Sequence, residues 1–299
     1  MESTHTPRTP RTPAGQFPRP IIIPPLQQPH QHTIILLHGR GSNARKFHRP
    51  LLDTALDLDG HQTFQEALPT ARFVFPTAPM SRATKYARML IHQWFDGAGD
   101  WEPEARGGMR PSIEYIQRLV RSEIRLLGGD ARHVVLAGLS QGCATALTSL
   151  LLWDGQSLGA VVGLCGYVPA CSHLIRTYDE GPEEEDDDVF ERDEGQAPRS
   201  PLMRVLEELR DEAELEDVAA SWNFGASSTP VFLGHGTLDP KVNISQAFLA
   251  DELLRRMGMS VELRTYEGLG HWYSREMLCH VVTFLRKHLA PQSALGNLV

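Results

Sequence analysis

The most informative part of this sequence is Val135-Leu136-Ala137-Gly138-Leu139-Ser140-Gln141-Gly142-Cys143-Ala144. A run of apolar, mostly β-branched residues ends in Gly-x-Ser-x-Gly, and small residues then lead into an apolar helical pattern. A strand, a sharp turn and a helix in this order form a nucleophile elbow, which exposes the serine hydroxyl at the end of a sheet. Gly138 and Gly142 have no Cβ, so the strand and the helix can approach closely. The stretch predicts Ser140 as a nucleophile on an α/β sheet.

Apolar runs and amphipathic helical patterns alternate on both sides of this stretch. Buried strands are predicted at 33–38, 72–75, 133–137, 159–164, 230–233 and 261–266, where the runs are continuous. Helical spacing of apolar residues predicts helices at 111–127, 244–257 and 276–289. Strands that alternate with helices indicate a mostly parallel sheet flanked by helices on both faces.

Two polar residues after Ser140 follow the ends of predicted strands. Asp239 comes shortly after the strand at 230–233, and His271 comes shortly after the strand at 261–266. The carboxyl ends of parallel strands meet at one edge of a sheet, so we expect the three side chains to converge. The chain order Ser, Asp, His is that of α/β hydrolases, in which the imidazole takes the serine proton and the carboxylate orients the imidazole.

An oxyanion hole needs two backbone N–H donors. The residue after the nucleophile, Gln141, supplies one, and the loop His38-Gly39-Arg40-Gly41 after an early strand supplies the other, for which we select the N–H of Arg40. The remaining histidines near these strand ends or on the last predicted helix are interpreted as structural: His235, His280 and His288.

The chain divides into a tail, one domain with an insertion, and a second tail. Residues 1–31 hold eight of the 21 prolines and predict a disordered Pro/Thr/Arg-rich tail, apart from a short edge strand at Ile21-Ile22-Ile23. Residues 32–290 are predicted to form a single hydrolase domain, and 291–299 a C-terminal tail. Residues 177–228 interrupt the strand–helix pattern as an acidic and helical insertion.

The insertion leaves the predicted sheet at the edge where Ser140 lies. Eleven carboxylates and one arginine between Asp179 and Glu194 predict a solvated loop. A helix capped by Ser200 follows, with Leu202, Val205, Leu206, Leu209 and Ala213 on one face. Two placements stay open: the helix covers the site as a lid, or it packs on the outside of the domain and never meets substrate.

Composition excludes several other classes of protein. The formal charge of −8 becomes about +2 without the acidic tract, and no basic face is clustered, which argues against nucleic-acid binding. No apolar run approaches the roughly 20 residues of a membrane span, so at most peripheral membrane contact is expected. No secretory signal is recognised, and four cysteines without paired spacing favour reduced thiols, a cytoplasmic location and no metal site.

Five motifs occur together in a fixed order. They are Leu37-His38-Gly39-Arg40-Gly41, Trp94-Phe95-Asp96, Gly138-Leu139-Ser140-Gln141-Gly142, His235-Gly236 with Asp239-Pro240, and Tyr266-Glu267-Gly268 with His271. Over residues 32–176 and 229–290 the chain resembles the acyl-protein thioesterase / phospholipase–carboxylesterase family of α/β hydrolases. Members with well-defined thioesterase activity usually have leucine at the position of Arg40 and aspartate at that of Ser42.

The resemblance implies a serine hydrolase that cleaves carboxylic esters and thioesters through an acyl-enzyme, without a cofactor. Its substrates would be acylated proteins, such as S-palmitoyl proteins, or small acyl esters and lysophospholipids. The family's catalytic residues fall on Ser140, Asp239 and His271, and its oxyanion N–H groups on Arg40 and Gln141. The segment with Trp94 and Phe95 matches a loop near the substrate site.

Two alternatives to a depalmitoylating or lysophospholipase-like enzyme remain open at this point. One is a carboxylesterase of small molecules that uses the same catalytic groups. The other is a partner-binding protein without activity, in which the acidic tract recruits basic partners. The intact Ser, Asp, His order argues against the second alternative.

Overall fold

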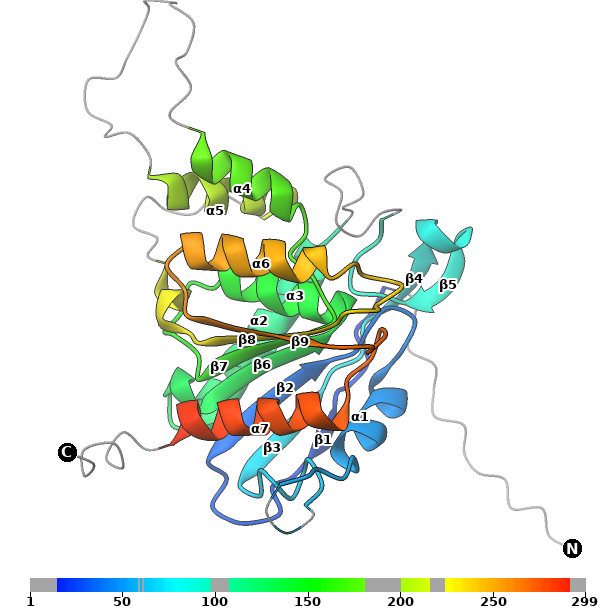
Figure 1. The fold of residues 1–299 in the computed structure, drawn as a ribbon, viewed down its shortest axis with the longest axis vertical. Helices are drawn as coiled ribbons and strands as arrows, with labels where there is room; N and C mark the ends of the chain where they lie inside the picture. Colours follow the sequence, from blue (N-terminus) through cyan, green and yellow to red (C-terminus); the bar gives the residue numbers. More distant parts are fainter. Residues whose placement is uncertain are drawn as a thin grey trace, which may run out of the picture.

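The structure is a computed structural model and describes residues 15–58, 60, 62–97, 108–180, 200–215 and 224–290. A seven-stranded sheet has the order β1-β3-β2-β6-β7-β8-β9, in which β1 is antiparallel and the other strands are parallel (Figure 1). The strands are β1 Ile21–Ile23, β2 His32–Leu37, β3 Ala71–Phe75, β6 Val134–Leu139, β7 Ala160–Leu164, β8 Val231–Gly236 and β9 Val261–Tyr266. The predicted mostly parallel sheet is confirmed.

Helices cover both faces of this sheet (Figure 1). One face carries α1 (Ala44–Leu52) and α7 (Arg275–Leu289), and the other carries α2 (Arg110–Leu126), α3 (Gln141–Leu151) and α6 (Ser245–Arg256). Two further helices, α4 (Cys171–Asp179) and α5 (Pro201–Glu212), lie together on the outer side of α6. No helix in the described ranges is both long enough and apolar enough to cross a membrane.

The sheet has a hydrophobic core on each of its faces, which explains why the strand sequences are continuous apolar runs. Successive side chains of a strand point to opposite faces. In β2, Ile34 and Leu36 belong to the core under α1 and α7, while Ile35 and Leu37 belong to the core under α2, α3 and α6. A strand that is buried on both faces therefore needs an apolar residue at nearly every position.

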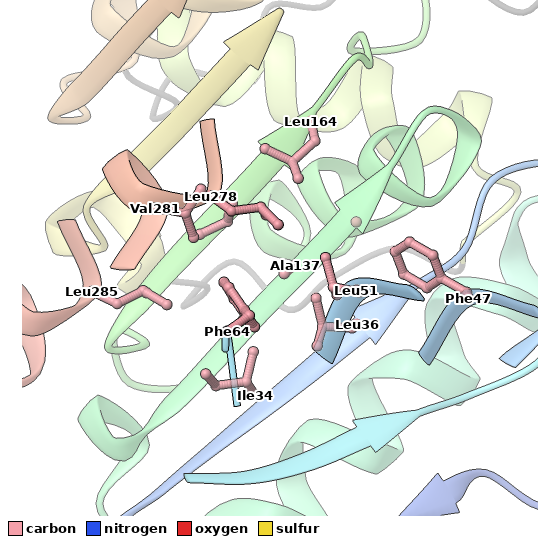
Figure 2. Close-up of a pocket in the computed structure, with 12 residues that line it drawn as sticks. Ile34, Leu36, Phe47, Leu51, Phe64, Ala137, Leu164, Leu278, Val281 and Leu285 are labelled. Atoms are coloured by element: carbon pink, nitrogen blue, oxygen red, sulfur yellow. The ribbon is translucent and has the colours of Figure 1, made fainter. Parts of the chain in front are cut away.

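A small apolar cavity of about 20 Å³ lies between the sheet and α1 and α7 (Figure 2). Figure 2 shows Ile34, Leu36 and Ala137 from the strands facing Leu278 and Leu285 of α7. The volume is enough for about one water molecule, and the walls are apolar. This cavity is a packing defect of the core.

The boundary predicted at residue 31 is wrong, because the folded body begins before it. Within the predicted tail, β1 pairs with β3, and Phe17 stacks on Tyr115 with ring centroids 4.1 Å apart. The N–H groups of Gln27 and Gln31 donate to carbonyls of the main domain. Proline-rich sequence packs here because a sheet edge supplies partners for its few N–H groups. Residues 1–14 and 291–299 of the predicted tails lie outside the described residues.

Within the insertion, the predicted helix is present but the lid placement is wrong for it. Ser200 caps α5 by accepting from the N–H of Met203, and Val205, Leu206 and Leu209 are buried. This apolar face packs on α4, and no residue of α5 lines the cavity at Ser140. The apolar face of α5 is buried in the core, so it is not available to cover the substrate. Most of the acidic tract, residues 181–199, lies outside the described residues.

A β-hairpin and a helix were not predicted from the sequence. The loop before Trp94 contains an antiparallel hairpin, β4 (Met80–Ala83) and β5 (Met89–His92), joined through a short 3₁₀ turn, η1 (Thr84–Tyr86). The hairpin lies beyond the arrowhead ends of the central strands (Figure 1), at the edge of the sheet that bears Ser140. Helix α4 is the second unpredicted element.

Candidate active site

Ser140 occupies the sharp turn between β6 and α3. Its backbone has φ 58° and ψ −122°, a conformation that side-chain-bearing residues rarely adopt. A Cβ added to Gly138 would lie 2.2 Å from the carbonyl oxygen of Gly142, and one added to Gly142 would lie 2.4 Å from that of Leu37. Only glycine fits at both positions, which explains how the sequence holds the serine in this strained turn.

The three residues predicted to converge do so. The Nε2 atom of His271 lies 2.9 Å from the Oγ atom of Ser140, and its Nδ1 atom lies 2.7 Å from the Oδ2 atom of Asp239. Ser140 follows β6, Asp239 follows β8 and His271 follows β9, so the carboxyl ends of parallel strands bring them together. This arrangement can move a proton from the serine hydroxyl to the imidazole while the carboxylate fixes the tautomer.

Asp239 is held ionised by its neighbours. Its side chain is fully buried, and burial alone would raise its pKa. Hydrogen bonds outweigh burial: the imidazoles of His235 and His271 and the backbone N–H groups of Val242 and Lys241 all donate to the carboxylate and lower its pKa well below the usual range. The buried carboxylate is therefore a fixed negative charge behind His271.

The loop after β2 lies directly against Ser140. A Cβ on Gly39 would be 3.3 Å from the Cβ of Ser140. His38 fixes this loop, since its Nδ1 donates to the carbonyl of Gly39 at 2.8 Å and its Nε2 accepts from the N–H of Ala78 at 3.0 Å. Burial is the main cause that lowers the pKa of His38 to about 4. The ring is thus a neutral support for the loop that carries Arg40, the predicted oxyanion donor.

Trp94 and Phe95 do not line the cavity, so their prediction as substrate-binding residues is wrong. They are 2% and 3% exposed, and the Nε1–H of Trp94 donates to the carbonyl of His38 at 2.8 Å. The Gln141 side chain accepts from the N–H of Trp94 at 3.0 Å and donates to the carbonyl of Phe95 at 2.7 Å. Behind the cavity, the segment with Trp94 and Phe95 is thus hydrogen-bonded to both predicted oxyanion elements. These elements are the loop at His38 and the start of α3.

An open cavity of about 350 Å³ lies over Ser140 and His271. Its other walls come from four loops, from α1 and from the junction of β6 with α3: Gly39, Arg40, Ser42, Phe47, Lys85, Tyr86, Leu139, Gln141, Pro240, Lys241, Val242 and Trp272. Phe47 also lines the apolar cavity of Figure 2. Within the described ranges no three histidine, cysteine or acidic side chains are grouped as metal ligands.

His235 was interpreted as structural, but it contacts the carboxylate of the site. It is 1% exposed, and its Nε2–H lies 2.9 Å from the carbonyl of Val242 and 3.3 Å from the Oδ2 atom of Asp239. In the sequence, the spacing of four residues between His235 and Asp239 was the signal that could have indicated this contact. Lys85 and Tyr86 were also missed, because the hairpin that carries them was not predicted.

The profile of the phospholipase/carboxylesterase family matches residues 19–177 and 215–289. The chain belongs to this family. It is therefore a hydrolase of carboxylic esters with an α/β-hydrolase fold, as predicted. The unmatched segment, 178–214, contains α5 and lies within the predicted insertion.

Relatives agree with this membership, and a solved structure agrees with the fold. The chain is 26% identical to acyl-protein thioesterase 1 of Debaryomyces hansenii over 86% of its own length and 91% of that protein. It is 25% identical to the carboxylesterase SOBER1 of Arabidopsis thaliana, over 76% and 81%. The fold matches the crystal structure of Zea mays acyl-protein thioesterase 2 with a TM-score of 0.62 and 22% identity, over 91% of this chain and 99% of that one.

Proposed function

We propose that the chain hydrolyses acyl thioesters and esters through an acyl-enzyme on Ser140. The observation that carries this proposal is the unbroken hydrogen-bond chain from Ser140 through His271 to Asp239. In this proposal Ser140 is the nucleophile, His271 the general base and acid, and Asp239 the group that orients the imidazole.

In the first half-reaction, the Ser140 Oγ atom attacks the acyl carbon as its proton passes to the Nε2 atom of His271. The negative charge that develops on the acyl oxygen is stabilised by the backbone N–H groups of Arg40 and Gln141. The start of α3 supports this role, because the N-terminal N–H groups of a helix favour negative charge. The C–S or C–O bond then breaks, and the imidazolium of His271 gives its proton to the leaving thiolate or alkoxide.

In the second half-reaction, a water molecule takes the place of the leaving group. His271 accepts a proton from the water, whose oxygen attacks the acyl carbon of the acyl-enzyme. When the tetrahedral species collapses, the proton returns to Ser140 and the carboxylic acid leaves. The net reaction consumes one water and releases one acid with one thiol or alcohol, so no cofactor is required.

Acylated proteins and lysophospholipids are the substrates we favour. Relatives that match over most of their length are named acyl-protein thioesterase 1, which supports an S-acyl group as substrate. The free thiols of the four cysteines fit a cytoplasmic site of action. A carboxylesterase of small molecules is the second candidate, and the cavity of about 350 Å³, near the lower end for small-molecule sites, favours it.

The test compares Ser140→Ala with the wild type on an S-palmitoyl peptide and on a short oxyester. We expect both activities to fall by about 10⁴-fold or more, with thermal unfolding unchanged. Ser245→Ala, which changes an exposed serine at the start of α6, is the matched control and should retain activity. Wild-type cleavage of the short ester alone would favour the second candidate, and full activity of Ser140→Ala would overturn the mechanism.

A further inference from the structure

His235 is a buried imidazole near the end of a central strand, in contact with Asp239. It is the next-to-last residue of β8, which lies between β7 and β9 in the sheet. Its side chain is 1% exposed and does not line the cavity over Ser140. His235 therefore does not meet substrate, and any contribution that it makes to the reaction acts through another residue.

The Nε2–H group of His235 is shared between two acceptors. The Nε2 atom lies 2.9 Å from the carbonyl oxygen of Val242 and 3.3 Å from the Oδ2 atom of Asp239. Because a carbonyl only accepts, Nε2 carries the proton. The N–H of Val242 donates in turn to the Oδ1 atom of Asp239 at 3.0 Å. These contacts close a ring that joins the strand, the carboxylate and a loop that lines the cavity.

Within the part of the chain that the structure describes, four N–H groups donate to the carboxylate of Asp239. The backbone N–H groups of Lys241 and Val242 belong to the same loop as Asp239, so they move with it. The imidazole of His271 is the group that Asp239 must orient, and it lies on a loop after β9. His235 is the one of the four donor residues that belongs to a strand. Of these four bonds, only the one from His235 fixes the carboxylate to the sheet.

The same end of β8 packs against the loop that leads to His271. A Cβ added to Gly236 would lie 2.1 Å from the carbonyl oxygen of Leu269. The N–H of Leu238 donates to that carbonyl at 3.0 Å. A carboxylate of Asp239 that is fixed to β8 is therefore also fixed relative to His271.

We propose that His235 is a positioning residue for the reaction, because its Nε2–H holds the carboxylate of Asp239 where it orients His271. The inference rests on the proposed function, since it concerns the aspartate of the same site. Without this bond the carboxylate can turn or shift, because its backbone donors move with its own loop. A displacement of about 1 Å at a reacting group can lower the rate about 10²-fold.

The test compares His235→Gln with His235→Asn. Both side chains carry an amide N–H donor, but only glutamine is long enough to place its nitrogen where Nε2 of the imidazole lies. The kcat on a short ester is divided by the number of active sites, which is counted from the end point of labelling with a fluorophosphonate. We expect His235→Asn to lower kcat per site about 10-fold to 100-fold, and His235→Gln to stay within about threefold of the wild type.

His280→Asn and His280→Gln are the matched controls. His280 lies on α7, where its Nδ1 atom is 3.0 Å from the hydroxyl of Tyr266, and it does not line the cavity. Both control variants should keep the wild-type kcat. Equal kcat per site in the two His235 variants would overturn the inference, because a merely structural residue changes the number of active sites and not the rate at each one. A wild type that is neither labelled nor active would instead count against the proposed function.

A second measurement uses the wild type and does not depend on the folding of a variant. In protein labelled with ¹⁵N-histidine, proton–nitrogen correlation spectra report which ring nitrogen carries the proton. We expect a proton on Nε2 of His235 that exchanges slowly with water, because the ring is buried and this N–H is hydrogen-bonded. A proton on Nδ1 alone would overturn the inference, since Nε2 could then not donate to Asp239.

Discussion

At the scale of single residues, Asp239 is the group on which the site's electrostatics depend. It is a buried carboxylate that accepts from two imidazoles and two backbone N–H groups. We predict that Asp239→Asn lowers kcat by about 10⁴-fold, because an amide cannot stabilise the imidazolium or fix the same tautomer of His271. Steady-state kinetics on a short thioester would measure the loss.

Asp251→Asn is the matched control for this change. Asp251 lies on α6, where its carboxylate pairs with Arg255 at 2.8 Å, away from the site. Its neutralisation should leave kcat within about twofold of the wild type, since exposed ion pairs contribute little. Equal activity of both variants would show that Asp239 is not part of the reaction.

The sequence predicted the three convergent residues because chain order and strand ends determine their position. It did not predict the surroundings of Asp239. Whether His235 points to the carboxylate, and whether Trp94 faces substrate or the back of the oxyanion loop, depends on side-chain packing across distant loops. A motif can name a segment near the site, but it cannot say which side of that segment faces the cavity.

At the scale of elements, α5 is part of the core. Leu206 is fully buried and belongs to the same cluster as residues of α4. We predict that Leu206→Ala lowers the free energy of unfolding by about 2–5 kcal/mol and leaves the preference for acyl-chain length unchanged. Urea unfolding and a series of C4 to C16 esters would measure the two effects.

Asp211→Ala, on the exposed side of the same helix, should change neither property by more than about 0.5 kcal/mol or twofold. A shift of chain-length preference in a folded Leu206→Ala protein would restore the lid placement of α5. Stability equal to the wild type would instead show that the helix does not pack as described.

Elements differed in how well the sequence predicted them. The buried strands and the amphipathic helices were predicted, because burial on one or both faces leaves a periodic pattern. The β4–β5 hairpin was missed, because its strands are four residues long and its tip is basic, polar and exposed. The packing partner of α5 could not be predicted from the sequence. An apolar stripe indicates that one face of a helix is buried, but it does not indicate which element packs against that face.

At the scale of the whole molecule, acid should destabilise the fold through His38. Its pKa is about 4 in the folded protein and 6.5 in the ordinary case, mainly because it is buried. Above pH 6.5 the ring is neutral in both states and adds no pH dependence. As the pH falls from 6.5 towards 4, the unfolded chain binds a proton that the folded protein does not, so stability falls by about 1.4 kcal/mol per pH unit.

Urea unfolding of the wild type and of His38→Gln between pH 7 and 4.5 measures this contribution. Glutamine cannot titrate, and its amide oxygen can still accept from the N–H of Ala78. We expect a shallower loss of stability with acid in the variant, whatever its stability at pH 7. Parallel curves for the two proteins would show that His38 is not the group responsible.

Mapping a covalent adduct shows whether Ser140 is the nucleophile of this hydrolase. The protein is treated with a fluorophosphonate, digested and sequenced by tandem mass spectrometry. We predict one adduct per molecule, on the peptide that contains Ser140, and no adduct when His271 is replaced by alanine. An adduct on another serine, or equal labelling of Ser140→Ala, would show that Ser140 is not the nucleophile.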